Sequence, residues 1–148
     1  MNEYLNSLHP SVRFSRLVFR FAGLLGLLEI VPLYFAEGAL NRTQPPAVTH
    51  PEFYYGFIGV VVAWQIAYLI MSDDPVRYMP LFPAVFLEKL LYPAALAVLY
   101  AGGRVQAAVT LAGGAIDLCL LALFVVSWLR LTKVPADPWE IASASRWW

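Results

Sequence analysis

The chain has 148 residues, of which 60% are hydrophobic and 14% are charged, and its mean hydropathy is +0.64. Soluble domains carry roughly a quarter of charged residues, and a small domain exposes too much surface to hide so apolar a composition. Lysine and arginine together balance aspartate and glutamate, so the formal net charge is zero. This charge balance excludes the basic surface that a nucleic-acid partner requires. The composition therefore indicates an integral membrane protein.

Cysteine and histidine are too few, and too unfavourably placed, for metal chemistry. Cys119 is the single cysteine and lies in an apolar run, so it forms neither an intrachain disulfide nor a zinc site. The two histidines, His9 and His50, lie outside the apolar runs, whereas haem, di-iron and intramembrane zinc sites need histidines inside them. We therefore expect no metal and no cofactor.

Four apolar stretches have about the 20 residues that a membrane-spanning helix requires. They cover residues 17–40, 53–71, 83–101 and 105–131. Proline-rich residues 41–51, the turn Ser72–Pro75 and the pair Gly102–Gly103 separate them. Because short connections make sequential helices antiparallel neighbours, the sequence predicts an all-α integral membrane fold. We expect an antiparallel bundle of four transmembrane helices, one domain over residues 1–148, with a tail over residues 132–148.

The basic residues predict the orientation, because arginine and lysine concentrate on the cytoplasmic side of a membrane. Arg42 and Arg104 are the basic residues of one side. The N-terminus, the second connection and the C-terminus share the other side, with Arg13, Arg16, Arg77, Arg130, Lys133 and Arg146. We expect both termini to be cytoplasmic, in a bacterial inner membrane, with Arg77 as an anchor at the membrane interface.

Five polar residues interrupt the predicted spans: Glu29, Gln65, Glu88, Lys89 and Asp117. Each costs a few kcal/mol in hydrocarbon, so each should face the interior of the protein, pair, or extend to the interface. For Asp117 and Glu29, which lie near mid-span, two interpretations stay open. One is a hydrogen bond to a neighbouring helix, and the other is a ligand or proton site. Gln65 is typical of interhelical hydrogen bonding.

The adjacent charges Glu88 and Lys89 point about 100° apart on a helix, so they are not expected to pair. If this helix begins at Pro83, Lys89 lies about 9 Å from its end, and its ammonium can extend to the cytoplasmic headgroups. We expect Lys89 to be an interface anchor and Glu88 to face inward.

Together the acids suggest a polar cavity within the membrane, lined by Glu29, Gln65, Glu88 and Asp117. Membrane lipids are the expected partners, and the pocket would bind a lipid-like or amphipathic small molecule. Two alternatives remain. The chain is an accessory or structural subunit of a larger membrane complex or homo-oligomer, or it is a membrane enzyme or proton-coupled carrier. We favour a role without catalysis, and no residue is assigned as catalytic.

The run from Tyr55 to Pro80, followed by Leu87–Lys89 and the span around Asp117, resembles an uncharacterised group of small bacterial four-helix membrane proteins. The resemblance covers residues 17–131. The four-span layout with intramembrane acids is also similar to DoxX-like proteins and to the EXPERA sterol-isomerase and sigma-receptor group. The sterol isomerases in that group use intramembrane histidines, which this chain lacks. The resemblance therefore implies the fold, and it carries no catalytic residue over.

Overall fold

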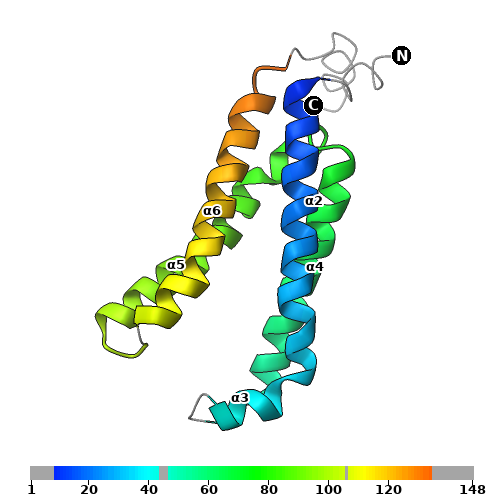
Figure 1. The fold of residues 1–148 in the computed structure, drawn as a ribbon. Helices are drawn as coiled ribbons and strands as arrows, with labels where there is room; N and C mark the ends of the chain where they lie inside the picture. Colours follow the sequence, from blue (N-terminus) through cyan, green and yellow to red (C-terminus); the bar gives the residue numbers. More distant parts are fainter. Residues whose placement is uncertain (1–8, 44–46, 106, 135–148) are drawn as a thin grey trace, which may run out of the picture. The chain divides into compact units, whose positions relative to one another are not determined.

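The computed structural model of the chain describes residues 9–43, 47–105 and 107–134. Every regular element among them is a helix (Figure 1). In chain order the elements are α2 (Pro10–Ile30), the 3₁₀ helix η1 (Val31–Phe35), α3 (Glu37–Thr43), α4 (Pro51–Asp73), the 3₁₀ helix η2 (Met79–Leu81), α5 (Phe82–Ala101) and α6 (Ala107–Leu131).

Four helical segments are long and apolar enough to cross a membrane: Pro10–Phe35, Pro51–Asp73, Met79–Ala101 and Ala112–Leu131. This confirms the prediction of an all-α integral membrane fold with four spanning helices. Of the predicted tail, residues 135–148 lie outside the described residues.

The first span differs in detail from its prediction. Its helix begins at Pro10, and its regular α-helical part ends at Ile30, before residue 40. Pro32 explains this early end, because it has no N–H to donate to the carbonyl of Leu28, so the helix tightens into η1. The short helix α3 follows as a separate element.

The packing divides the chain into two compact units. Of the described residues, 9–18, 75–105 and 107–134 belong to unit 1, and 19–43 and 47–74 belong to unit 2. The long helix α2 contributes its first part to unit 1 and the remainder to unit 2.

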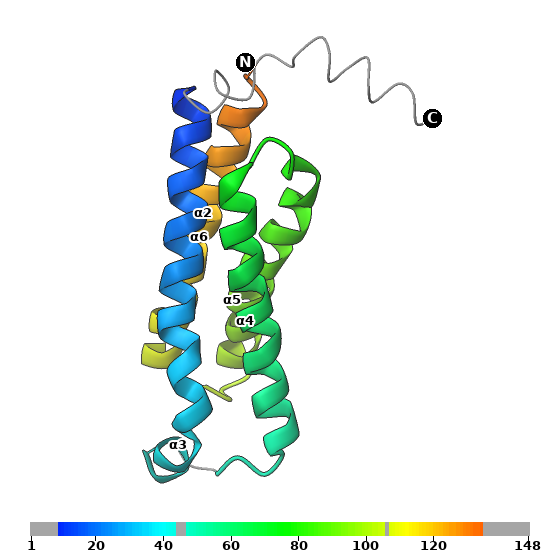
Figure 2. The same cartoon turned by 90° about the vertical axis from the view of Figure 1, so that its right-hand side faces the viewer.

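Unit 1 is built on a hairpin of α5 and α6, which lie side by side in both views (Figures 1 and 2). Gly102 caps α5, and Gly103 has φ +67°, a left-handed conformation that favours glycine. The N–H of Arg104 donates to the carbonyl of Leu99 over 2.9 Å and closes the turn. The predicted glycine cap is therefore confirmed, and it fixes α5 and α6 in a definite register.

Small residues bring the two helices of this hairpin close together. A Cβ added to Gly113 would lie 3.0 Å from the hydroxyl of Tyr92, and one added to Gly114 would lie 3.7 Å from Pro93 and from Leu96. The apolar side chains buried in this hairpin are Phe82, Val85, Leu96, Leu120, Phe124 and Leu131. The polar residues discussed below therefore lie beside a tightly packed apolar seam.

In unit 2, the part of α2 that begins at Phe19 lies along α4. The rings of Phe19 and Tyr68 are 5.9 Å apart, and Gly23 and Gly26 both face Gln65. At the end of α4, the Arg20 guanidinium lies 3.2 Å from the Asp73 carboxylate. Both of these charged side chains are more than half exposed, so they mark one polar boundary of this helix pair.

The glycines of α2 provide a direct test of this packing. A Cβ at position 26 would overlap the side-chain amide of Gln65, which is only 1% exposed and has little room to move. We expect Gly26→Ala to destabilise the protein by about 1–3 kcal/mol, as overpacked cores do. The measurement is equilibrium unfolding in mixed detergent micelles.

Gly56 in α4 is the matched control, since a Cβ there would meet nothing within 4 Å. We expect Gly56→Ala to be neutral, or to stabilise the protein by about 0.5–1 kcal/mol through helix propensity. Equal effects of the two substitutions would contradict the packing described for α2 and α4.

Candidate functional site

The polar site of unit 1 is formed by neighbouring residues of α5 and one residue of α6. Lys89 lies 13 residues before Gly102, and Asp117 lies 14 residues after Gly103. Because the hairpin turn is tight, residues equally far from it lie at the same level of the two helices. Glu88 precedes Lys89 on α5 and completes the group, which we call the ionic trio.

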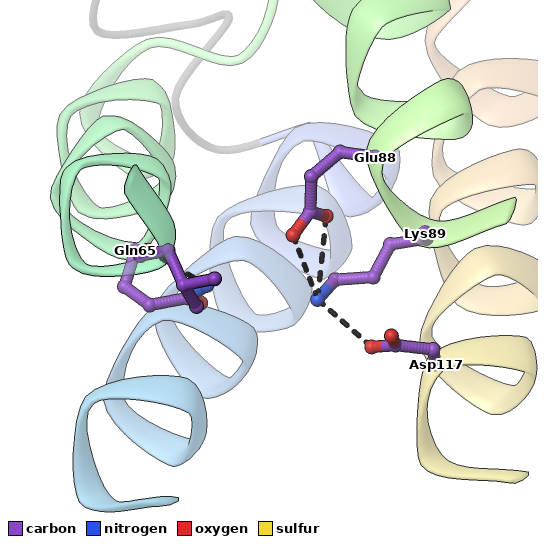
Figure 3. Close-up of polar contacts among 5 residues, drawn as sticks. Gln65, Glu88, Lys89 and Asp117 are labelled. Carbon is purple, nitrogen blue, oxygen red and sulfur yellow. Dashed lines mark hydrogen bonds and ion pairs between the residues drawn. The ribbon is translucent and has the colours of Figure 1, made fainter. Parts of the chain in front are cut away.

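Within the ionic trio, the ammonium of Lys89 lies between the two carboxylates (Figure 3). Its Nζ donates to Oδ1 of Asp117 over 3.0 Å and lies 3.3 Å from both carboxylate oxygens of Glu88. The Lys89 side chain is 7% exposed, against 16% for Glu88 and 19% for Asp117. The cation is thus enclosed, whereas the acids keep part of their surface open.

The surroundings make this pairing strong. Val85, one turn before Lys89, and Leu120, almost one turn after Asp117, are both buried. Coulomb attraction grows as the effective dielectric constant falls, so ions paired among such side chains attract each other more strongly than on a water-exposed surface. The paired charges also reduce the cost of placing each of them in an apolar span.

The structure corrects the expectation that Lys89 is an interface anchor. Its side chain does not extend to the end of the helix but turns to Asp117 on the facing helix. The hairpin register brings the Asp117 carboxylate within reach of Lys89, a contact that the sequence of α5 alone does not reveal. The prediction that Glu88 and Lys89 do not pair is wrong too. Their Cβ atoms point about 100° apart, but the lysine side chain is long enough for its ammonium to reach the Glu88 carboxylate.

A proline follows the ionic trio by one helical turn on α5. Pro93 lies inside α5 and has no N–H. The residue whose carbonyl it would otherwise bond is Lys89, four residues earlier. Pro93 therefore interrupts the regular hydrogen bonding of α5 one turn after Lys89.

Gln65 belongs to unit 2 and is held differently. Its Nε2 donates to the carbonyl of Val61 in its own helix over 3.3 Å. Its Oε1 is buried against Gly26 and has no hydrogen-bond donor among the described residues. The amide joins α4 to α2 by close packing against glycine, and not by the interhelical hydrogen bond that was expected.

Glu29 and Arg77 are both exposed. Glu29 lies on α2 in unit 2, and it forms no hydrogen bond or ion pair with any described residue. The Arg77 guanidinium lies 5.8 Å from the centre of the neighbouring Tyr78 ring. The structure thus brings Glu88 and Asp117 together, while the larger pocket that also includes Glu29 and Gln65 stays a prediction, as does the anchor role of Arg77.

Within the described parts of the chain, no group of three or more His, Cys, Asp and Glu residues is arranged to hold a metal ion. Comparisons of the chain with protein-family models, curated proteins and solved structures gave no match. The resemblance to DoxX-like and EXPERA proteins therefore stays a prediction.

The ionic trio predicts a clear response to loss of its cation. Lys89→Met keeps the length of the side chain but leaves two carboxylates without the ammonium between them. We expect the variant to lose roughly 3 kcal/mol of stability, because removing one partner of a buried ion pair leaves an uncompensated charge. Equilibrium unfolding in mixed micelles measures this loss.

Two further variants make the result specific to the trio. Lys133→Met removes an exposed lysine near the end of α6 and should leave stability unchanged. Adding Asp117→Leu to Lys89→Met should recover part of the loss, because one of the uncompensated carboxylates is gone. Additive effects of the two substitutions would show that Lys89 and Asp117 are not coupled.

Proposed function

We propose that the protein binds a lipid-like or amphipathic small molecule within the membrane, with its polar head at the ionic trio. The observation that carries this proposal is the accessible carboxylate of Asp117. Lys89 donates only to Oδ1 of this carboxylate, and Oδ2 has no donor among the described residues. The Asp117 side chain is 19% exposed, so its carboxylate is partly open to the surroundings.

The chemistry around this oxygen favours a head group that donates hydrogen bonds. Two carboxylates surround one ammonium. The negatively charged groups of the trio therefore outnumber its one cation. An ammonium, hydroxyl or amide head would complement them, and an ammonium would form the stronger, charge-assisted hydrogen bond.

The surrounding surface suits the apolar body of such a molecule. Ile116 and Leu118, the chain neighbours of Asp117 on α6, are exposed hydrophobic side chains. In a membrane these side chains contact hydrocarbon, so an alkyl chain beside them loses nothing relative to the bilayer. The contacts of the polar head with the ionic trio then make the molecule bind at this site in preference to dissolving in the bilayer.

A second candidate function is that of a subunit of a larger membrane complex. Glu29 favours it, because an exposed carboxyl group in a span, with no described partner, is costly in lipid and would be relieved by a donor from another chain. This candidate does not use the ionic trio, so the two functions can be separated experimentally.

We also infer the location of the protein from its basic residues. The ends of α2 and α6 that are expected to share one side of the membrane carry Arg13, Arg16, Arg130 and Lys133. This bias supports cytoplasmic termini, and the resemblance to small bacterial membrane proteins supports a bacterial inner membrane.

The proposal predicts selective stabilisation by an amphipathic amine. Dodecylamine is added to the protein in neutral detergent, at an amine concentration below that at which the amine forms micelles. At about ten times the Kd of the amine, the Tm of the protein should rise by about 4 °C. Dodecanol, with the same chain and no charge, should have a smaller effect. Thermal unfolding followed by tryptophan fluorescence measures both.

Asp117→Asn should abolish the difference between the amine and the alcohol, because it removes the negative charge and keeps the shape. Asp73→Asn is the control, since that carboxylate is exposed and pairs with Arg20 in unit 2. Equal stabilisation by amine and alcohol in the wild-type protein would overturn the proposal.

A further inference from the structure

The end of unit 2 opposite Asp73 carries a second polar group, built from η1, α3 and the first turns of α4. The Tyr55 hydroxyl donates to Oε2 of Glu37 over 2.7 Å, and the Tyr54 hydroxyl donates to the carbonyl of Leu33 over 2.7 Å. The ring of Tyr55 stacks on that of Tyr34, with centroids 6.1 Å apart. Two tyrosines of α4 thus hold the chain that follows the break at Pro32.

The depth of this group can be counted along α4. Asp73, with its partner Arg20, marks one polar boundary, and Tyr55 lies 18 residues before it. At 1.5 Å per residue this is about 27 Å, close to the ~30 Å thickness of the hydrocarbon core. The tyrosines and Glu37 therefore lie where hydrocarbon meets the phospholipid headgroups.

Glu37 has a free acceptor at this level. Tyr55 occupies Oε2, and Oε1 has no donor among the described residues, although it is not one of their buried unpaired atoms. Tyr55, which donates to this carboxylate, and Tyr34, whose ring stacks on that of Tyr55, are each 37% exposed. A carboxylate flanked by open tyrosine rings has the chemistry that binds an ammonium group, through ionic attraction and cation–π contact.

A basic group lies on the same short helix. The Arg42 side chain folds back along α3, so that its Nη1 would lie 3.8 Å from a Cβ added to Gly38, the residue after Glu37. Arg42 forms no hydrogen bond or ion pair with any described residue, Glu37 included. A guanidinium of this kind binds phosphate oxygens in a bidentate manner.

We propose that this end of unit 2 binds the headgroup of a zwitterionic phospholipid, with Glu37 and the rings of Tyr34 and Tyr55 on its ammonium and Arg42 on its phosphate. Glu37 and Arg42 form no ion pair with any described residue, and they lie five residues apart on one short helix, so their opposite charges match those of such a headgroup. This site is separate from the ionic trio and does not depend on the function proposed there.

Native mass spectrometry of the protein in neutral detergent, titrated with short-chain phospholipids, tests the site. Phosphatidylethanolamine or phosphatidylcholine should bind about tenfold more tightly than phosphatidylglycerol, which has phosphate but no ammonium. Glu37→Gln, whose amide oxygen can still accept from Tyr55, should reduce this preference to about twofold or less. Arg42→Gln should weaken the binding of all three lipids.

The matched control is Glu52→Gln at the start of α4, where the carboxylate is exposed and lies 3.1 Å from His50. It should keep the wild-type lipid preference. Three outcomes would overturn the proposal: no preference for either zwitterionic lipid in the wild type, a Glu37→Gln variant that retains the preference, or an equal loss in Glu52→Gln. Thermal unfolding of each variant confirms that the fold is kept.

Discussion

The ion pair between Lys89 and Asp117 is the contact on which the arrangement of unit 1 depends. A lysine in an apolar span is costly unless a counter-charge lies beside it, and its 3.0 Å contact to Asp117 exists only while α5 and α6 keep their register. Gly102 and Gly103 provide this register through a tight turn, and Gly113 and Gly114 allow the helices to approach. The ion pair, the glycine turn and the small residues therefore all stabilise the same register of α5 and α6.

In unit 2, polar groups are accommodated in an apolar environment without a buried ion pair among the described residues. The Gln65 amide packs against Gly26 of α2, whereas the charged pair Arg20–Asp73 lies at one end of α4. At the other end, tyrosine hydroxyls bind Glu37 and the carbonyl of Leu33. The strongest charges of this unit thus lie near the two boundaries, with Glu29 as the exposed exception within the span.

Each unit carries a group of polar residues that we propose to bind a membrane molecule. In unit 1 the ionic trio includes the partly exposed carboxylate of Asp117, next to the exposed side chains of Ile116 and Leu118. In unit 2 the group around Glu37 has an acid and a base on one short helix. Both arrangements suit molecules with a polar head and an apolar body, and neither contains the set of ligands that a metal requires. This common chemistry connects the proposed function of the protein to its membrane environment.

The sequence by itself determined the all-α fold, the four apolar spans, the turn at Gly102–Gly103 and the polar residues that need partners, because these follow from composition and local geometry. Only the tertiary structure decided which partner each of these polar residues contacts. The spacing of Lys89 and Asp117 from the turn was visible in the sequence, but its meaning depended on α5 and α6 packing against each other. The contact between Gly26 and Gln65 had no local signal, since the two residues come from separate helices. Which polar side chains pair in a membrane protein depends on which helix faces pack together. The packing of these faces is determined only in the folded chain.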